Sequence, residues 1–217
     1  NYLEKDTGKV LHDQKEGKNY VYGTEILSSD EVIDIAGYNF DSADKDTLTI
    51  QVKDNVINLY YTKKDATVIV HHYKEGTIEK VANDVTVTGK VGDDYETAIA
   101  EDLPSKYELA LEPANKVGTM TEEQIEVIYY YKLKSTKVIV HHYEEGTTNK
   151  LSEDVEIEGL IDSTYTTTSA DDIPIKYTLV ETPLNATGIM TEEVIEVTYY
   201  YAVKDAELNI YYLEKDT

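Results

Sequence analysis

The sequence has 217 residues and contains no cysteine and no apolar run long enough to cross a membrane. The absence of cysteine excludes disulfide bonds, thiolate metal sites and a cysteine nucleophile. Because a transmembrane helix needs about 20 mostly apolar residues, nothing here predicts membrane insertion. No signal peptide or sorting motif is found either, so the export and anchoring segments of a secreted parent are expected outside this sequence.

Basic residues are also scarce. Lysine and arginine number 20 against 43 acidic residues, which gives a formal net charge of −23. Nucleic acids and anionic membrane surfaces are polyanions, so both are excluded as partners. The chain is nevertheless 41% hydrophobic and carries 20 tyrosines, which is too apolar and aromatic for a disordered protein. We therefore expect a folded, soluble, acidic protein.

The sequence repeats itself every 70 residues. Residues 68–73 (VIVHHY) return as 138–143, residues 120–123 (MTEE) return as 190–193, and YLEKDT opens and closes the chain. A period of this length is a small domain rather than a solenoid turn. We predict a divergent repeat with a truncated first strand at 1–64, full repeats at 65–134 and 135–204, and the start of a fourth repeat at 205–217. The short, charged joints between them predict stiff connections.

Within each repeat, Gly, Asp and Pro separate short β-type segments, and helical periodicity is absent over any long stretch. The predicted strands are 66–73, 85–89, 107–112, 125–132, 136–143, 155–159, 177–182 and 195–202. Residues 93–100 are expected to form a short irregular or extended segment rather than a helix, because their counterpart 163–168 is rich in threonine.

Aligned copies show which face of a strand is buried, because a polar residue in one copy marks an exposed position. Val68 aligns with Leu208, whereas Ile69 aligns with Asn209, so the even-numbered positions form the core face. His72 and His142 end this inward row. The side chains predicted to point outward are His71, His141, Tyr60, Tyr130 and Tyr200.

The paired histidines and paired glutamates suggest metal or catalytic sites, which the sequence argues against. Adjacent strand residues face opposite ways, so His71 and His72 do not chelate one ion, and tyrosines replace both histidines at 211 and 212. Neighbouring carboxylates such as Glu122 and Glu123 do not flank a glycosidic bond; we interpret them as solvated turn residues. We predict no enzyme, no metal and no cofactor, and leave open calcium at the aspartate clusters and a Lys–Asn isopeptide bond.

A further set of motifs recurs in a fixed order. They are Gly92 with Tyr95 and Thr97, Leu103-Pro104, Tyr107, Pro113, Gly118-x-Met120-Thr-Glu-Glu and Tyr129-Tyr130-Tyr131. This order resembles the MucBP (mucin-binding protein) repeats of Gram-positive cell-wall-anchored surface proteins, such as those of lactobacilli and listerial internalin-like proteins. The resemblance implies a mainly β protein, a tandem array of small β-grasp-like (ubiquitin-like) domains in an elongated rod. Immunoglobulin-like β-sandwich repeats are the alternative.

The resemblance also implies a function and a location. We expect a segment of a surface adhesin that binds mucin or another host glycoprotein, in an extracellular, cell-wall-anchored parent protein. The alternative is a passive stalk that holds a distal binding domain away from the cell wall. Flat aromatic side chains with a polar edge suit sugar stacking and interface rims, so the candidate ligand-binding residues are His71, Tyr130, His141, Tyr200 and Tyr60.

The last residues repeat the first strand of a repeat without the rest of it. We therefore predict that this tail either stays unpaired or joins the open edge of the first repeat in another molecule. In the second case the molecules associate head to tail through residues 206–213.

Overall fold

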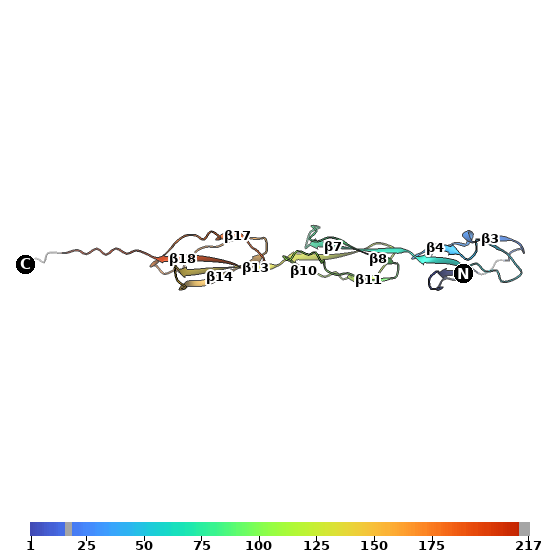
Figure 1. The fold of residues 1–217 in the computed structure, drawn as a ribbon, viewed down its shortest axis with the longest axis horizontal. Coiled ribbons are helices and arrows are strands. Elements are labelled where there is room, and N and C mark those ends of the chain that lie inside the picture. Colours follow the sequence, from blue (N-terminus) through green and yellow to red (C-terminus); the bar gives the residue numbers. More distant parts are fainter. Residues whose placement is uncertain (16–18, 213–217) are drawn as a thin grey trace, which may run out of the picture. The chain divides into compact units, whose positions relative to one another are not determined.

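The computed structural model describes residues 1–15 and 19–212. The chain divides into two compact units, Asn1–Pro104 with Leu109–Tyr131 and Ser105–Glu108 with Lys132–Thr217. Each unit is built from β-strands (Figure 1), and the described residues include one short 3-10 helix, Ser28–Glu31. Among them no helix reaches the length and hydropathy that a membrane crossing requires. The repeat boundaries stay a prediction, and the ranges 1–64, 65–134 and 135–204 are called the first, second and third repeats below.

The second and third repeats have the same strands. In the second repeat, β7 (Asp65–Lys74), β8 (Val85–Lys90), β10 (Tyr107–Leu111) and β12 (Ile125–Leu133) form a sheet of order β10-β12-β7-β8, and β9 (Asp94–Glu96) pairs with β11 (Val117–Thr119). In the third, β13 (Ser135–Glu144), β14 (Lys150–Leu160), β16 (Tyr177–Leu179) and β18 (Ile195–Val203) form a sheet of order β14-β13-β18-β16, and β15 (Thr164–Thr166) pairs with β17 (Thr187–Ile189). All eight predicted strands are present, and residues 94–96 and 164–166 are extended as expected. The short strands β11 and β17 were not predicted.

The first repeat has the same sheet with a shorter central pair of strands. Its strands β1 (Tyr2–Glu4), β2 (Val10–His12), β4 (Tyr38–Ala43) and β6 (Leu59–Lys63) have the order β2-β1-β6-β4, and β3 (Glu25–Leu27) pairs with β5 (Thr47–Thr49). Strand β1 has 3 residues where β7 and β13 each have 10. The first repeat therefore has the same order of sheet strands around a much shorter first strand.

The first and last strands of every repeat lie side by side and run parallel. Strand β12 pairs in parallel with β7, β18 with β13 and β6 with β1. This central parallel pair, flanked by antiparallel strands, is the β-grasp-like arrangement that the resemblance implies. The immunoglobulin-like alternative is wrong, because that sandwich is built from antiparallel sheets.

One face of each central pair forms the core. Val68, Val70 and His72 of β7 are 0–2% exposed, and the facing Val127 and Tyr129 of β12 are 0–1% exposed. Side chains alternate along a strand, so the apolar residues at every second position all reach this face. The third repeat buries the same positions, among them His142. The predicted inward row is confirmed, both inward histidines included.

The recurring glycines are explained by what lies against them. A Cβ on Gly118 would stand 2.9 Å from the Tyr95 hydroxyl, and a Cβ on Gly89 would stand 2.7 Å from the Met120 sulfur. Met120 is buried, so neither neighbour can move freely. Larger residues here would force repacking, which costs about 1–3 kcal/mol. The glycine, tyrosine and methionine of the repeat motif thus belong to one packing unit.

Glu122 joins the first and second repeats within the first compact unit. Its carboxylate accepts a hydrogen bond from the backbone of Gly37 and pairs with Lys64, whose Nζ lies 2.8 Å away. Lys64 foremost, with the Gly37 N–H, holds the pKa of Glu122 below its usual value. Lys63 adds an ion pair with Asp93 at 3.1 Å. Glu122 is an exposed turn residue, as expected, and it also makes these contacts, which the sequence did not predict.

Candidate functional site

The outward face of the second repeat carries an aromatic row over β7 and β12. The rings of His71 and Tyr73 are stacked, with centroids 5.4 Å apart and planes at 9°. Tyr130 of β12 stands in register with Tyr73 of β7. Paired residues of neighbouring strands point to the same side of a sheet. The three side chains therefore share one face, opposite the core.

The same arrangement recurs in the third repeat. His141 stacks on Tyr143, with centroids 5.8 Å apart and planes at 20°, and Tyr143 is in register with Tyr200. Tyr200 is 44% exposed. The predicted outward residues His141 and Tyr200 therefore lie on one face, as His71 and Tyr130 do in the second repeat. Tyr73 and Tyr143 were not predicted, although their position two residues after the histidine puts them on that face.

The outward histidines are less accessible than the sequence suggested. The His71 side chain is 16% exposed and its Nδ1 lies 3.2 Å from Asp84, whose carboxylate also pairs with Lys80 at 2.7 Å. Lys80 foremost, together with His71, lowers the pKa of the Asp84 carboxyl. We infer that the histidine supports the stacked tyrosine rather than presenting its own ring.

The third repeat has the same contacts around its outward histidine. The Nδ1 of His141 lies 2.9 Å from Asp154, and Lys150 pairs with the same carboxylate at 3.0 Å. His141 foremost, followed by Lys150, lowers the pKa of Asp154. In both repeats the histidine that stacks on the tyrosine thus also lies against an aspartate that pairs with a lysine.

A hollow lies beside Tyr130. Its volume is about 590 Å³, and it is lined by Tyr130, Leu111 and the turn of residues 75–78. Ile78 and Leu111 are 88% and 62% exposed. The volume falls in the range of small-ligand sites, roughly 300–1,000 Å³. Tyr130 thus presents its ring next to a partly apolar depression.

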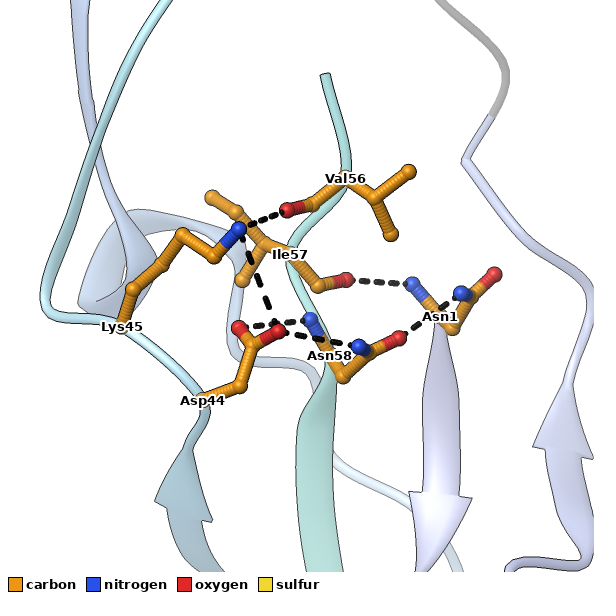
Figure 2. A network of polar contacts seen from close by, with 6 residues as sticks. All are labelled: Asn1, Asp44, Lys45, Val56, Ile57 and Asn58. Carbon is orange, nitrogen blue, oxygen red and sulfur yellow. Dashed lines mark hydrogen bonds and ion pairs between the residues drawn. The ribbon is translucent and has the colours of Figure 1, made fainter. Parts of the chain in front are cut away.

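Tyr60 has a different setting in the first repeat. Tyr60 is in register with Leu3, which occupies the repeat position of Tyr73. Asn1 occupies the repeat position of His71. Figure 2 shows Asn1 held by its neighbours, with its Nδ2 donating to Asn58 Oδ1 at 2.8 Å and Asn58 Nδ2 donating to Asp44 at 2.9 Å. The face of the first repeat therefore has Tyr60 without the stacked pair.

The inward histidines belong to the core. His72 Nδ1 lies 2.9 Å from the Tyr131 hydroxyl, and its ring stacks on Tyr129 with centroids 5.6 Å apart. His142 has the same partners, Tyr201 and Tyr199. Burial lowers the pKa of both histidines. Their role is packing, because neither side chain reaches solvent.

Two other possibilities concern the described residues: a metal site and a Lys–Asn isopeptide bond. Within residues 1–15 and 19–212, no group of three or more His, Asp or Glu side chains is placed to hold a metal ion. Asn115 Nδ2 donates to the Glu126 carbonyl at 2.9 Å, while Lys80 and Lys106 pair with carboxylates. These contacts place neither lysine against Asn115.

Solved structures with a related arrangement share little sequence with this chain. Streptococcal High Identity Repeats in Tandem domains 3–4 from a cell surface protein match at 10% identity, covering 65% of this chain and 99% of that one, with a TM-score of 0.34. Mub-RV matches at 11% identity over 64% of this chain and 100% of that one, with a TM-score of 0.28. The Bacillus anthracis TIE protein matches at 13% identity over 72% and 38%, with a TM-score of 0.40. At these scores the likenesses carry no further argument.

Sequence relatives are nearer. Internalin J of Listeria monocytogenes serovar 1/2a is 33% identical over 159 residues, which are 70% of this chain and 18% of that protein. Internalin J of serotype 4b is 34% identical over 140 residues, 64% of this chain and 14% of that protein. The chain thus spans less than a fifth of the length of these curated relatives.

The MucBP domain model matches residues 67–132 and 137–202. Both ranges begin in the first strand and end in the last strand of a four-stranded sheet. Together they make up more than half of the chain, which therefore belongs to the MucBP domain family, a family of repeats of extracellular surface proteins.

Proposed function

We propose that this chain is a repeat segment of a bacterial surface adhesin and binds mucin-type glycoprotein through the outward aromatic faces of the second and third repeats. The observation that carries the proposal is the stacked pair of His71 and Tyr73, with Tyr130 in register beside it and next to the hollow. The parent protein is proposed to be extracellular and anchored to the cell wall of a Gram-positive bacterium. It binds without catalysis, cofactor or metal.

The row suits a sugar ligand for physical reasons. A tyrosine ring offers a flat apolar face and a polar hydroxyl edge, so it can cover the apolar face of a pyranose while hydrogen-bonding its hydroxyls. Stacking on His71 restrains Tyr73 before binding, which lowers the entropy lost when the ligand docks. Two such faces on one chain bind a multivalent glycoprotein more tightly than either alone.

Net charge narrows the ligand class. At a formal charge of −23 the chain repels anionic ligands. Neutral O-linked glycans therefore bind better than sialylated or sulfated ones. Sialidase treatment of the mucin is expected to strengthen binding, and raising the salt concentration is expected to reduce that difference.

The test compares mucin binding by the 217-residue chain and two double variants. Tyr130→Ala with Tyr200→Ala removes the ring that β12 or β18 contributes to each face and is expected to weaken binding about tenfold or more. The matched control is Val117→Ala with Ile189→Ala, which removes apolar side chains that are 51% and 60% exposed on the two-stranded sheets. The control is expected to bind like the unaltered chain.

Circular dichroism establishes that both variants are folded. Equal binding by the folded tyrosine variant and the unaltered chain would remove these faces from the binding site. Equal weakening of both variants would show that the effect is not specific to the aromatic row.

A stalk is the second candidate function, and the contacts of Glu122, Lys63 and Lys64 at the joint favour it. Ion pairs and backbone hydrogen bonds across a short joint restrict its motion, which suits a spacer. A spacer binds no glycan in any form. Absence of mucin binding by the unaltered chain on a glycan array and in a pull-down would select this function over the first.

A further inference from the structure

The hollow beside Tyr130 is built on a turn whose backbone is held in place. The Glu75 N–H donates a hydrogen bond to the Tyr131 carbonyl at 2.8 Å. Gly76 has a φ of 72°, in the left-handed region that glycine adopts at little cost. The turn of residues 75–78 is therefore fixed against the end of β12, next to the outward ring.

The third repeat has the same turn. The Glu145 N–H donates to the Tyr201 carbonyl at 2.9 Å, and Gly146 has a φ of 71°. Tyr200 occupies the repeat position of Tyr130. The second and third repeats therefore offer a ligand the same backbone turn and the same aromatic ring.

The side chains around this turn differ between the two repeats. In the second repeat Ile78 and Leu111 line the hollow and are 88% and 62% exposed, and most of the accessible surface of the lining is apolar. At the same positions the third repeat has Thr148 and Glu181, both exposed. A hydroxyl and a carboxylate thus replace the two aliphatic side chains, so the two faces present different chemistry to a ligand.

The lining of the hollow favours one chemical group. Ile78 and Leu111 offer apolar contact, and the carboxylate of Glu75, which also lines the hollow, can accept a hydrogen bond. A neutral acetamido group matches both, because it ends in a methyl group and carries an N–H donor. An anionic substituent does not match, because Glu75 repels it. Among neutral sugars that stack on a tyrosine, an N-acetylhexosamine therefore fits better than a plain hexose.

We propose that the hollow of the second repeat is a subsite for the acetamido group of a neutral N-acetylhexosamine, with the sugar ring on Tyr130 and the methyl group against Ile78 and Leu111. These two aliphatic side chains set the specificity. The third repeat, which lacks them, binds neutral sugars without this preference.

The inference rests on the proposed function, because it takes the aromatic faces to be sugar-binding. It is independent of the association predicted for residues 206–213, whose last residue, Leu213, lies outside the described part of the chain.

The experiment measures binding of the 217-residue chain to polymers that display either N-acetylgalactosamine or galactose at equal density. These sugars differ in one substituent, an acetamido group in place of a hydroxyl. Tyr200→Ala silences the third-repeat face and Tyr130→Ala silences the second-repeat face, so each face is measured alone. The second-repeat face is expected to prefer the acetamido sugar about tenfold, which one methyl group in an apolar pocket can supply. The third-repeat face is expected to show little preference.

Exchange of the lining tests the two aliphatic residues. In the Tyr200→Ala chain, Ile78→Thr with Leu111→Glu introduces the residues of the third repeat and is expected to abolish the preference. The matched control in the same chain is Ile99→Thr with Val117→Glu, which makes the same types of change at side chains that are 53% and 51% exposed and lie outside the hollow. The control is expected to keep the preference, and circular dichroism establishes that both variants are folded.

The reverse exchange provides a gain of function. In the Tyr130→Ala chain, Thr148→Ile with Glu181→Leu is expected to give the third-repeat face a preference for the acetamido sugar. Because this variant adds a property, loss of folding cannot imitate the expected result.

The outcomes separate the two proposals. An unaltered chain that binds neither mucin nor either polymer overturns the proposed function and this inference with it. A chain that binds mucin but does not discriminate between the polymers through its second-repeat face overturns the inference alone. So does a preference that survives Ile78→Thr with Leu111→Glu in a folded chain, or an equal preference by the third-repeat face.

Discussion

The first and second repeats place a buried tyrosine at the same point of the sheet and give its hydroxyl different partners. The Tyr61 hydroxyl bonds to both the N–H and the carbonyl of Ile33, each at 3.1 Å. The Tyr131 hydroxyl lies 2.9 Å from His72 Nδ1 and accepts from the Ala100 N–H at 3.1 Å. A backbone carbonyl in one repeat is thus exchanged for a histidine in the other.

The first and second repeats also differ at the positions that correspond to residues 71–73. Tyr2 replaces His72 in the core, and Asn1 and Leu3 replace His71 and Tyr73 on the outward face. The sheet survives these changes because strand order and inward apolar positions are kept. The paired histidines are therefore a feature of the second and third repeats rather than a requirement of the fold, and the expected acid sensitivity and the proposed binding face of these two repeats depend on them.

Acidification is expected to produce the largest difference, since it acts on the second and third repeats together. Burial lowers the folded-state pKa of His72 and His142, against the opposing attraction of Asp102 and Asp172. An unfolded histidine titrates near about 6.5, so below that pH the unfolded chain binds more protons. The stabilisation is complete above this pH, and the free energy of unfolding falls as pH decreases towards the folded-state pKa values.

Thermal unfolding at about pH 7.5 and about pH 5.5 measures this loss. In His72→Tyr with His142→Tyr, which introduces the residue of the first repeat, the loss between the two pH values is expected to shrink. An equal loss in the variant and the unaltered chain would show that other groups cause it.

Shortening one side chain in the last strand of a repeat tests how well the cores of the first and second repeats are packed. Val127→Ala removes atoms from a side chain that is 0% exposed and is expected to lower the free energy of unfolding by about 2 kcal/mol. Ile57→Ala removes more atoms from the half-buried counterpart in the first repeat, yet is expected to cost about 1 kcal/mol or less. Denaturant titration measures both free energies of unfolding. A larger cost at Ile57 than at Val127 would show that the two cores are packed alike at this position.

Removal of the hydroxyl group tests the exchanged partners. Tyr131→Phe leaves His72 Nδ1 and the Ala100 N–H without their partner in the core, and a loss of about 1–2 kcal/mol is expected. Tyr61→Phe frees the backbone of Ile33, which is half-buried, so water can replace part of the bond and the loss is smaller. Equal losses, measured by denaturant titration, would contradict the difference between the repeats.

The smallest effect is expected at the joint. Glu122→Ala removes the acceptor of the Gly37 N–H and the partner of Lys64, so the Gly37 amide should exchange its hydrogen faster. Glu123→Ala is the matched control, because Glu123 occupies the same turn and its side chain has no such bond in the structure. Hydrogen exchange measured by NMR gives the answer; similar exchange in both variants would show that Glu122 does not hold the joint.

Much of the fold could be predicted because each copy of the repeat reports on the others. Asn209 aligns with Ile69 in the repeat, and this polar residue identified the exposed side of the first strand. That assignment put both His72 and His142 in the core. The pairing of the first and last strands follows from the β-grasp arrangement that the family resemblance implies, since alternation alone does not fix strand order; the structure shows that this pair is parallel. The short pairs β9–β11 and β15–β17 were partly missed because three-residue strands leave no periodic pattern.

The candidate site was predicted in part. Outward positions could be assigned from alternation, but alternation does not specify the stacking of His71 on Tyr73 or the approach of Asp84 to His71. The joint role of Glu122 also depends on a residue 85 positions away, Gly37. Neither contact leaves a local sequence signal.

The most direct test of the account is footprinting of tyrosine side chains with hydroxyl radicals, with and without a desialylated mucin. The account predicts protection of Tyr73 and Tyr130 in the second repeat and of Tyr143 and Tyr200 in the third, with little change at Tyr60. Protection of Tyr60 equal to that of Tyr130, or protection confined to residues outside these faces, would contradict it.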